Sequence, residues 1–229
     1  MTDKKQDGSV GGTLYDTLRH DIVFGRLAAG SKLPLGDLKE AYGVSISTLR
    51  ESLNRLAADG FVTSEEQRGF FVAPMTQDGL RDIAALRVLI EGYALEQSIL
   101  KGDTEWEATI VAAHHKLHRM EQRMIRGDHT MRERWKQYDW EFHQALIGAC
   151  GSEELLLLHR TVFDKYLRYQ MRVLTFRGEV AAEEHRRLLD AALDRDAATA
   201  GAVLRSHVDG GVRHSLANWS GMADGLPAR

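Results

Sequence analysis

Asp139 and His143 form a pair whose residue types and spacing could do chemistry. Residues four apart on a helix lie on one face, one turn from each other. The same face carries Trp135, Leu146 and Cys150, which continue the spacing of three and four. Charged groups are costly to bury unless they are paired or bound to a metal. The pair therefore indicates either a core histidine with an aspartate partner or one half of a metal site.

Two further histidines lie on the apolar faces of two later helices. His185 shares its face with Leu188, and His207 follows Val203 by one turn. Three imidazoles and a carboxylate that converge in a core are typical ligands of a divalent transition metal. Zn²⁺ is the expected ion, with Ni²⁺, Mn²⁺ or Fe²⁺ as alternatives, and four protein ligands leave room for water or a bound acid. The predicted ligands are Asp139, His143, His185 and His207.

A second group of histidines, His114, His115 and His118, is the alternative metal site, because two of them are also four residues apart. They flank Leu117 in a strongly charged segment and have no carboxylate at a matching spacing. A surface or interface role is favoured over a second metal site.

Long helices must position the four predicted ligands. From residue 76 to 218 the hydrophobic spacing is helical, and glycines at 102, 127 and 151 end successive segments. Six helices are expected, with Leu117, Met120 and Met124 inward on the second and Leu157 inward on the fourth, which runs to about residue 176. The fold class is therefore mainly α, with an antiparallel helical bundle over residues 81–216, a linker at 75–80 and a tail at 217–229.

The first part of the chain has a different organisation. Residues 1–11 are polar and are expected to be a disordered tail, and residues 12–74 form a separate domain. A helix begins at Thr13, a short helix runs from Asp37 to Tyr42, and a third is capped by Ser45 or Ser47. The segments FVTSE and GFFVAP then predict a hairpin. Together these elements predict an N-terminal winged helix-turn-helix.

Composition limits the function classes. The chain has 229 residues, 43% hydrophobic and 28% charged, a net charge of −3 and one cysteine. The sequence contains no run of eighteen apolar residues, so no membrane span is expected. The first twelve residues lack the apolar core of a secretory signal. A single cysteine excludes an intrachain disulfide and favours a reducing, cytoplasmic location.

The third helix and the wing carry groups that suit a DNA backbone. The amino end of a helix favours phosphate, an arginine one turn further on can reach phosphate or guanine, and a glycine at the wing tip permits close approach. The predicted DNA-binding residues are Ser45, Ser47, Thr48, Arg50, Arg68 and Gly69.

This region resembles the GntR family of bacterial transcription regulators. The matching motifs are Gly25-Arg26-Leu27, Gly30, Leu33, Gly43-Val44-Ser45, Arg50-Glu51-Ser52-Leu53, Leu56, Gly60 and Arg68-Gly69. Asp37 and Ile46 stand where the family commonly has arginines, and residues 1–75 hold nine basic against ten acidic residues. Ile46 contacting a thymine methyl, or binding that relies on the avidity of a dimer, would each account for this departure.

The helical half resembles the FCD ligand-binding domain of the FadR branch of that family. The matching points are Arg87-x₃-Glu91, Asp139-x₃-His143, Glu184-His185-Arg186, Asp196-Ala197 and His207, whereas Ser152 departs from a frequent asparagine. The resemblance implies that the Asp and three His are metal ligands and that a small organic acid binds beside the metal. It implies Arg87 as the effector-binding arginine; the weaker candidates are Arg134, Arg168 and Arg172.

The resemblance implies a homodimeric regulator, usually a repressor, that binds double-stranded operator DNA and responds to a small carboxylate. Two alternatives remain at this point. The helical half could be a metal-dependent hydrolase or lyase, although no general base stands out near the ligands and a winged helix would then be unexplained. A regulator whose metal only stabilises the bundle is the other alternative.

Overall fold

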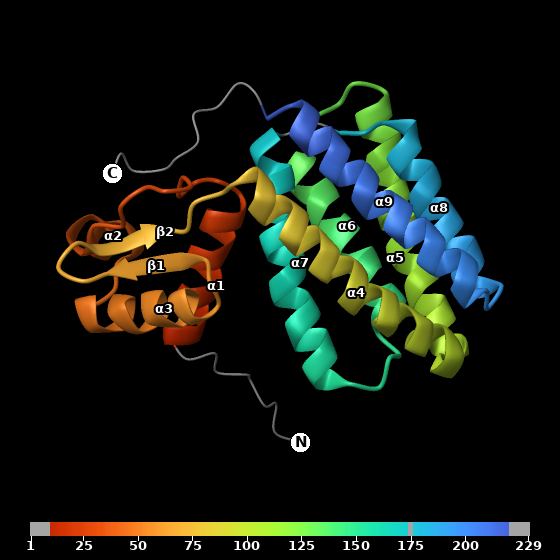
Figure 1. Cartoon of the computed structure of the whole chain (residues 1–229), viewed down its shortest axis with the longest axis horizontal. Coiled ribbons are helices and arrows are strands. Elements are labelled where there is room, and N and C mark those ends of the chain that lie inside the picture. The colour runs from red at the N-terminus through yellow and green to blue at the C-terminus, as the bar shows by residue number, and fades with distance from the viewer. Residues whose placement is uncertain (1–9, 174–175, 220–229) are drawn as a thin grey trace, which may run out of the picture. The chain divides into compact units, whose positions relative to one another are not determined.

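The computed structural model describes residues 10–173 and 176–219, and these residues form nine α-helices and a two-stranded sheet (Figure 1). They divide between Thr76 and Gln77 into two compact units. The mainly α fold class, with a winged helix-turn-helix followed by a helical bundle, is confirmed. None of the described helices is long and apolar enough to cross a membrane.

The first unit contains three helices and the hairpin. Its elements are α1 (Val10–Val23), α2 (Leu35–Tyr42), α3 (Ile46–Ala58), β1 (Val62–Glu65) and β2 (Gly69–Val72). The strands pair antiparallel with Val62 opposite Val72, and α3 packs against both α1 and α2. Helix α1 begins at Val10, within the predicted tail, and α2 begins two residues before the predicted Asp37 because the chain turns into it directly after Pro34.

Local capping explains how α2 gives way to α3. Gly43 has a φ of 65°, a left-handed conformation that suits glycine, and its N–H donates to the Lys39 carbonyl. Two residues later Ser45 caps α3, because its side chain accepts from the Thr48 N–H at 3.1 Å. The turn places the amino end of α3, the predicted recognition helix, on the surface.

The second unit contains six helices, as predicted. They are α4 (Gln77–Lys101), α5 (Thr104–Ile125), α6 (Arg132–Ile147), α7 (Glu153–Val173), α8 (Glu179–Leu193) and α9 (Ala197–Ala217). The linker predicted at 75–80 is shorter, because α4 begins at Gln77 and already buries Leu80. Helix α7 ends at Val173, and residues 174 and 175 of the predicted fourth helix lie outside the described residues.

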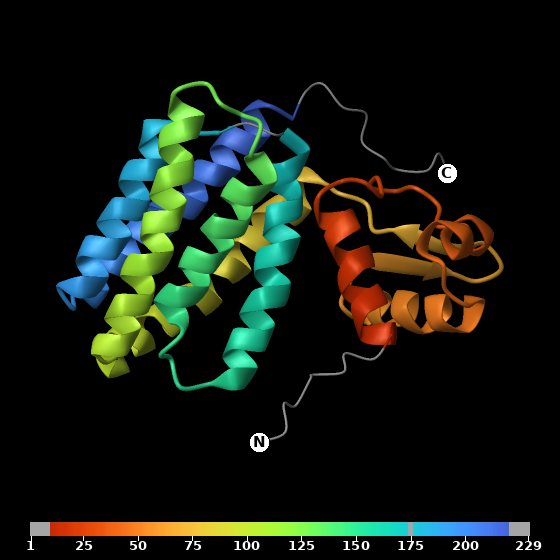
Figure 2. The ribbon, with the colours of Figure 1, turned by 180° about the vertical axis from the view of Figure 1, so that it is seen from behind.

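The six helices form two layers. Helix α4 lies between α7 and α9, as Figure 1 shows, and α5 lies between α6 and α8 in the layer behind, which faces the viewer in Figure 2. The side chains between the layers are largely apolar, with Phe142, Phe163 and Leu188 fully buried. Helices α6, α8 and α9, which carry the predicted metal ligands, surround one part of this core.

The carboxyl end of α4 is fastened to the turn between α8 and α9. Arg195 in that turn has a φ of 58° and donates to the carbonyls of Ile99 at 2.9 Å and Gly102 at 2.8 Å. Its guanidinium also lies 5.1 Å from the centre of the Trp106 ring and pairs with Glu107 on α5. One side chain thus satisfies the carbonyls at the end of α4 and fixes that end to its neighbours.

Candidate metal centre

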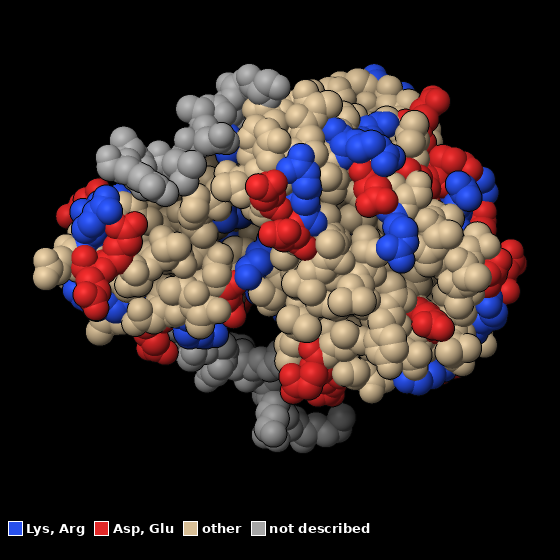
Figure 3. Space-filling view, viewed as in Figure 1, with Lys and Arg blue, Asp and Glu red and all other residues tan. Residues whose placement is uncertain are grey.

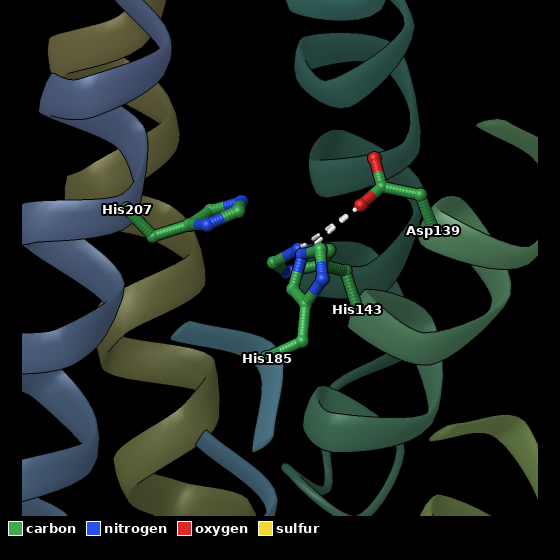
Figure 4. Close-up of side chains that lie close together, drawn as sticks. All are labelled: Asp139, His143, His185 and His207. Carbon is green, nitrogen blue, oxygen red and sulfur yellow. Dashed lines mark ion pairs between the residues drawn. The ribbon is translucent and has the colours of Figure 1, made fainter. Parts of the chain in front are cut away.

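Asp139, His143, His185 and His207 converge in the core of the helical unit (Figure 4). The first two lie one turn apart on α6, and the others come from α8 and α9. All four are buried, and one potential ligand atom from each lies within 4.8 Å of all the others. Among the described residues this is the cluster able to hold a metal, and its helices have brought together residues up to 68 positions apart, from 139 to 207.

Two imidazole nitrogen atoms face one carboxylate oxygen in the space between these residues. Nε2 of His185 lies 3.2 Å from Oδ1 of Asp139, and Nε2 of His143 lies 3.9 Å from the same oxygen. Neither nitrogen has a hydrogen-bond partner in the described structure, although both are buried. Buried polar atoms are nearly always paired, so two orphaned imidazole nitrogens facing one carboxylate fit a metal ion.

The spacing of the cluster also fits an ion, with a small contraction. Two atoms bound to one ion at about 2.1 Å lie about 3.4 Å apart in a tetrahedral site and at most about 4.2 Å apart in any site. The ligand atoms of the cluster all lie within 4.8 Å of one another, so the widest-spaced atoms would approach by up to about 1.4 Å around a tetrahedral ion. Rotation of the imidazoles about their side-chain torsions supplies a movement of this size.

Each of the three histidines is held from behind by a glutamate at its other nitrogen, Nδ1. The pairs are His143 with Glu91 of α4, His185 with Glu121 of α5 at 2.6 Å, and His207 with Glu184 of α8 at 2.8 Å. A carboxylate at Nδ1 fixes the tautomer that leaves Nε2 free for a metal, orients the ring and raises its basicity. The glutamates therefore prepare all three imidazoles as ligands.

Glu121 was not predicted from the sequence. The spacing of α5 predicted Met120 on the inward face, but Glu121 is the residue with no exposed surface, between Leu117 and Met124. Met120 and Glu121 both continue the helical spacing of three and four from Leu117 to Met124, and an apolar residue is the expected one on an inward face. A carboxylate in phase with Leu117 and Met124 is the signal that would have identified it.

The surrounding charges and burial shift the pKa values of the clustered residues in different directions. Burial favours the neutral acid, but Lys136 and the neighbouring histidines outweigh it and hold the pKa of Asp139 well below its usual value. Burial also opposes a charge on His185, yet Asp139 and Glu121 raise its pKa to about 9. Burial keeps the pKa of His143 below its usual value. In the metal-free protein a proton on His185 therefore takes the place of a cation.

Glu91 connects this centre to α4 and α7. Its carboxylate accepts from Nε of Arg87 at 2.8 Å and pairs with Nε2 of His159 at 2.9 Å, besides contacting His143. His159 is fully buried, whereas Leu157, predicted to face inward, is 60% exposed. That prediction was wrong because the run of four leucines before His159 fits several helical phases.

A small cavity adjoins the cluster, with about 30 Å³ of enclosed space. Asp139, His185 and His207 line it together with two basic side chains, Lys136 and Arg177. Lys136 bonds Oδ2 of Asp139 at 3.2 Å and Gln170 at 2.9 Å, and Arg177 pairs with Glu184 at 2.6 Å. The sequence prediction included neither of these basic residues. Lys136, next to an inward tryptophan, and Arg177, between two helices, both resemble solvent-exposed residues in the sequence.

The arginines predicted to bind the effector lie elsewhere. Arg87 is fully buried, is paired with Glu91 and lies 3.1 Å from Nδ1 of His143, behind the ligand rather than in the cavity lining. Arg134 is exposed near the Tyr138 ring. Burial lowers the pKa of Arg168 to about 10, and the Arg172 guanidinium lies 4.7 Å from the Trp219 ring centre. None of the four lines the cavity.

The histidines of the alternative site stay outside the cluster. The rings of His114 and His118 stack 5.9 Å apart on α5, and His114 also contacts Phe142. Burial lowers the pKa of His114 to about 4, so it is neutral at physiological pH. His114 thus packs against Phe142 and is not part of the cluster formed by Asp139, His143, His185 and His207.

The predicted DNA-binding residues occupy the amino end of α3 and the hairpin tip. Ser45 and Ser47 are exposed and their hydroxyls are 2.7 Å apart, while Ser45 and Thr48 are 2.9 Å apart. Arg50 is exposed one turn later, beyond the exposed Ile46. Two wing-tip residues complete this surface. Arg68 pairs with Glu65, and Gly69 has a φ of 92°.

A winged helix-turn-helix joined to a helical unit with a buried ligand cluster defines a DNA-binding transcription regulator with a sensory domain. Residues 11–72 match the model of the gntR family of bacterial regulatory proteins, and residues 82–210 match the FCD domain. The chain belongs to the GntR family and carries an FCD domain.

Relatives agree with this assignment. The chain is 41% identical to the HTH-type transcriptional regulator BphR of Paraburkholderia xenovorans over 86% of this chain and 82% of the relative. It is 32% identical to the HTH-type transcriptional repressor GlaR of Escherichia coli, over 85% of this chain and 90% of the relative. McbR/YncC of E. coli has the same fold, with a TM-score of 0.79 at 18% identity, covering 93% and 99% of the chains. The gntR family, BphR and GlaR are transcription regulators rather than enzymes.

Proposed function

We propose that this chain is a homodimeric transcriptional repressor of the cytoplasm, in the FadR branch of its family, whose FCD domain holds a divalent metal and a small organic acid. Binding of the acid changes the affinity of the winged domains for operator DNA. The observation that carries the metal site is the set of imidazoles aimed at one point, each with a glutamate at Nδ1. Zn²⁺ is the first choice for this ligand set, with Ni²⁺, Mn²⁺ or Fe²⁺ as alternatives.

The charge of the site supports an anionic effector. The site contains four carboxylates, of which Asp139 is one, and three basic side chains. Its formal charge is therefore −1 when the histidines are neutral. A divalent cation changes this to +1, and one carboxylate ligand restores neutrality. The charged residues are Asp139, Glu91, Glu121, Glu184, Arg87, Lys136 and Arg177.

The lining of the cavity supports an anionic ligand. Its enclosed space of about 30 Å³ restricts that ligand to a small one. Lys136 and Arg177 line it and can donate to a carboxylate, whereas Arg87 stabilises the shape of the site through Glu91 and His143. Lys136 and Arg177 therefore replace the four arginines predicted from the sequence as the proposed effector contacts.

DNA binding is proposed to use Ser45, Ser47, Thr48, Arg50, Arg68 and Gly69. The hydroxyl groups and free N–H groups at the amino end of α3 suit phosphate oxygens, and Arg50 is exposed beside them. Two copies would bind the two halves of a palindromic site.

Metal analysis tests the site. Protein purified without chelator should contain close to one divalent ion per chain, and His185→Ala and His207→Ala should lose most of it. His118→Ala, an exposed histidine outside the cluster, is the matched control and should retain it. Unchanged metal content in both site variants would contradict the proposed ligands.

A thermal-shift screen of small carboxylates, run with metal and with chelator, separates an effector site from a structural metal. An acid that stabilises only the metal-loaded protein and alters its retention of promoter DNA in a gel-shift assay supports the proposal. Arg177→Gln should weaken that response, while Arg134→Gln should leave it intact. If the metal-loaded protein fails to shift its own promoter region at low salt, the regulator function itself is contradicted.

A further inference from the structure

The carboxylate of Glu184 is shared between a proposed metal ligand and a residue of the cavity. Its Oε2 lies 2.8 Å from Nδ1 of His207 and 2.6 Å from Nη2 of Arg177. The two nitrogen atoms are 3.1 Å apart. When Nε2 of His207 is kept free for a metal, Nδ1 carries the proton, so both nitrogens donate to one oxygen and neither accepts from the other. Arg177 thus takes part of the negative charge that Glu184 would otherwise give to His207.

Arg177 also faces the space that an acid would occupy. It lines the cavity together with Lys136, and its side chain is 13% exposed. Arg87 contacts Glu91 and His143 in a similar way, but it is fully buried and is not among the lining residues. Figure 3 shows basic and acidic side chains interspersed over the face that carries α8 and α9. The basic residues of the cavity, rather than a broad basic surface, would therefore hold an anion.

A glycine of α9 makes room for the guanidinium group. A Cβ built on Gly210 would lie 2.4 Å from Nη1 of Arg177, so alanine at this position would clash with it. The clashing atom is the end of a flexible side chain, and the guanidinium can move while the helix stays in place. Gly201 lies on the same helix, and a Cβ built there meets nothing within 4 Å. The two glycines therefore offer a matched pair of substitutions.

We propose that Arg177 links the acid to the metal site by exchanging Glu184 for the carboxylate of the acid. A guanidinium binds carboxylates through paired hydrogen bonds, so the acid and Glu184 compete for it. Once Arg177 has turned to the acid, Glu184 is left to His207 alone and makes that imidazole a stronger ligand. The acid thus tightens metal binding, and the metal tightens acid binding by the same factor. The inference rests on the proposed function and adds the residue that couples its two ligands.

Zn²⁺ alone tests the release of Glu184, by competition of the metal-free protein against a coloured chelator. Gly210→Ala keeps the positive charge of Arg177 but moves it, and should bind Zn²⁺ about threefold to tenfold more tightly than wild type, a part of the full effect of a carboxylate behind a histidine. Gly201→Ala, which also replaces a helical glycine by a better helix former, should match wild type. Arg177→Gln should change the affinity in the same direction as Gly210→Ala. Weaker Zn²⁺ binding by folded Arg177→Gln would show that Arg177 supports the ligands, and would overturn the proposal.

Acetate serves as the carboxylate probe, with sodium chloride at the same ionic strength as the control. Acetate should tighten Zn²⁺ binding by wild type and by Gly201→Ala, and should have no such effect on Arg177→Gln. An equal effect on wild type and Arg177→Gln, or no effect on wild type, would overturn the exchange. A wild-type chain that binds no Zn²⁺ would contradict the proposed metal site itself. Zn²⁺ bound with the same affinity by wild type, Gly210→Ala and Arg177→Gln would contradict this inference alone.

Discussion

Glu121→Gln is the most direct test of the carboxylates behind the histidines. Glutamine can still accept a hydrogen bond from Nδ1 of His185, so the substitution removes charge while keeping the shape. Glu121 has no exposed surface, and its Oε1 lies 2.6 Å from His185 while Oε2 has no hydrogen-bond partner in the described structure. Its negative charge therefore acts almost entirely on one ligand.

Loss of a carboxylate behind a ligating histidine costs roughly 10–100-fold in metal affinity. Glu121→Gln should lie at the upper end, about 100-fold or about 2.7 kcal/mol. Glu184→Gln should lie near about 10-fold, because Glu184 is partly exposed and Arg177 already shares its charge at 2.6 Å. The structure thus predicts both a loss and a ranking.

Competition of the metal-free protein against a coloured chelator measures these affinities, and circular dichroism confirms that each variant is folded. Glu107→Gln, on the same helix but paired with Arg195, is the control and should match wild type. A folded Glu121→Gln protein whose affinity stays within about threefold of wild type would refute the reasoning, since that loss lies well below the expected 10–100-fold. A larger loss in Glu184→Gln would refute the ranking.

Four further predictions follow from the described contacts. Metal affinity should rise about tenfold per pH unit between pH 6.5 and about 9, because the ion displaces the proton of His185, whose pKa is about 9; a flat profile in the chelator competition would contradict this. In the metal-free protein the same raised pKa stabilises the fold fully below pH 6.5 and less as the pH rises through 9, so the denaturation midpoint should fall over that range. Ser45→Ala removes the cap of α3 and should cost about 1 kcal/mol in urea unfolding of the first unit. Arg87→Met leaves Glu91 buried without its main counter-charge and should cost about 3–5 kcal/mol in the second unit, and a loss below about 1 kcal/mol would show that the pair is not a buried ion pair in solution.

The proposed metal ligands could be found in the sequence because each lies on an apolar stripe within its own helix. Periodicity identifies such a stripe locally, so His143, His185 and His207 were visible one at a time. Their meeting point depends on how three helices pack, and the resemblance to a known family supplied that expectation. The winged unit was predictable for a similar reason, since Gly43 and Ser45 specify its central turn through local conformation and capping.

The residues behind and beside the ligands were not predictable in the same way. Glu121 and His159 are buried polar residues whose partners are 64 and 68 positions away in the sequence. Lys136 and Arg177 gain their role from a cavity that exists only once the helices are packed. Periodicity describes which face a residue occupies, but it does not show which distant charge that face will meet.

The fastening of α4 by Arg195 has a geometric consequence for signalling. With its carboxyl end held by Arg195, α4 can move most at its amino end, where the chain enters directly from the winged unit. Over 25 residues at 1.5 Å each, the helix is about 37 Å long, and a tilt of about 5° about its carboxyl end displaces its amino end by about 3 Å. Glu91 contacts His143 between the two ends. For such a tilt, a displacement of less than 2 Å at Glu91 corresponds to about 3 Å at Gln77, where α4 begins.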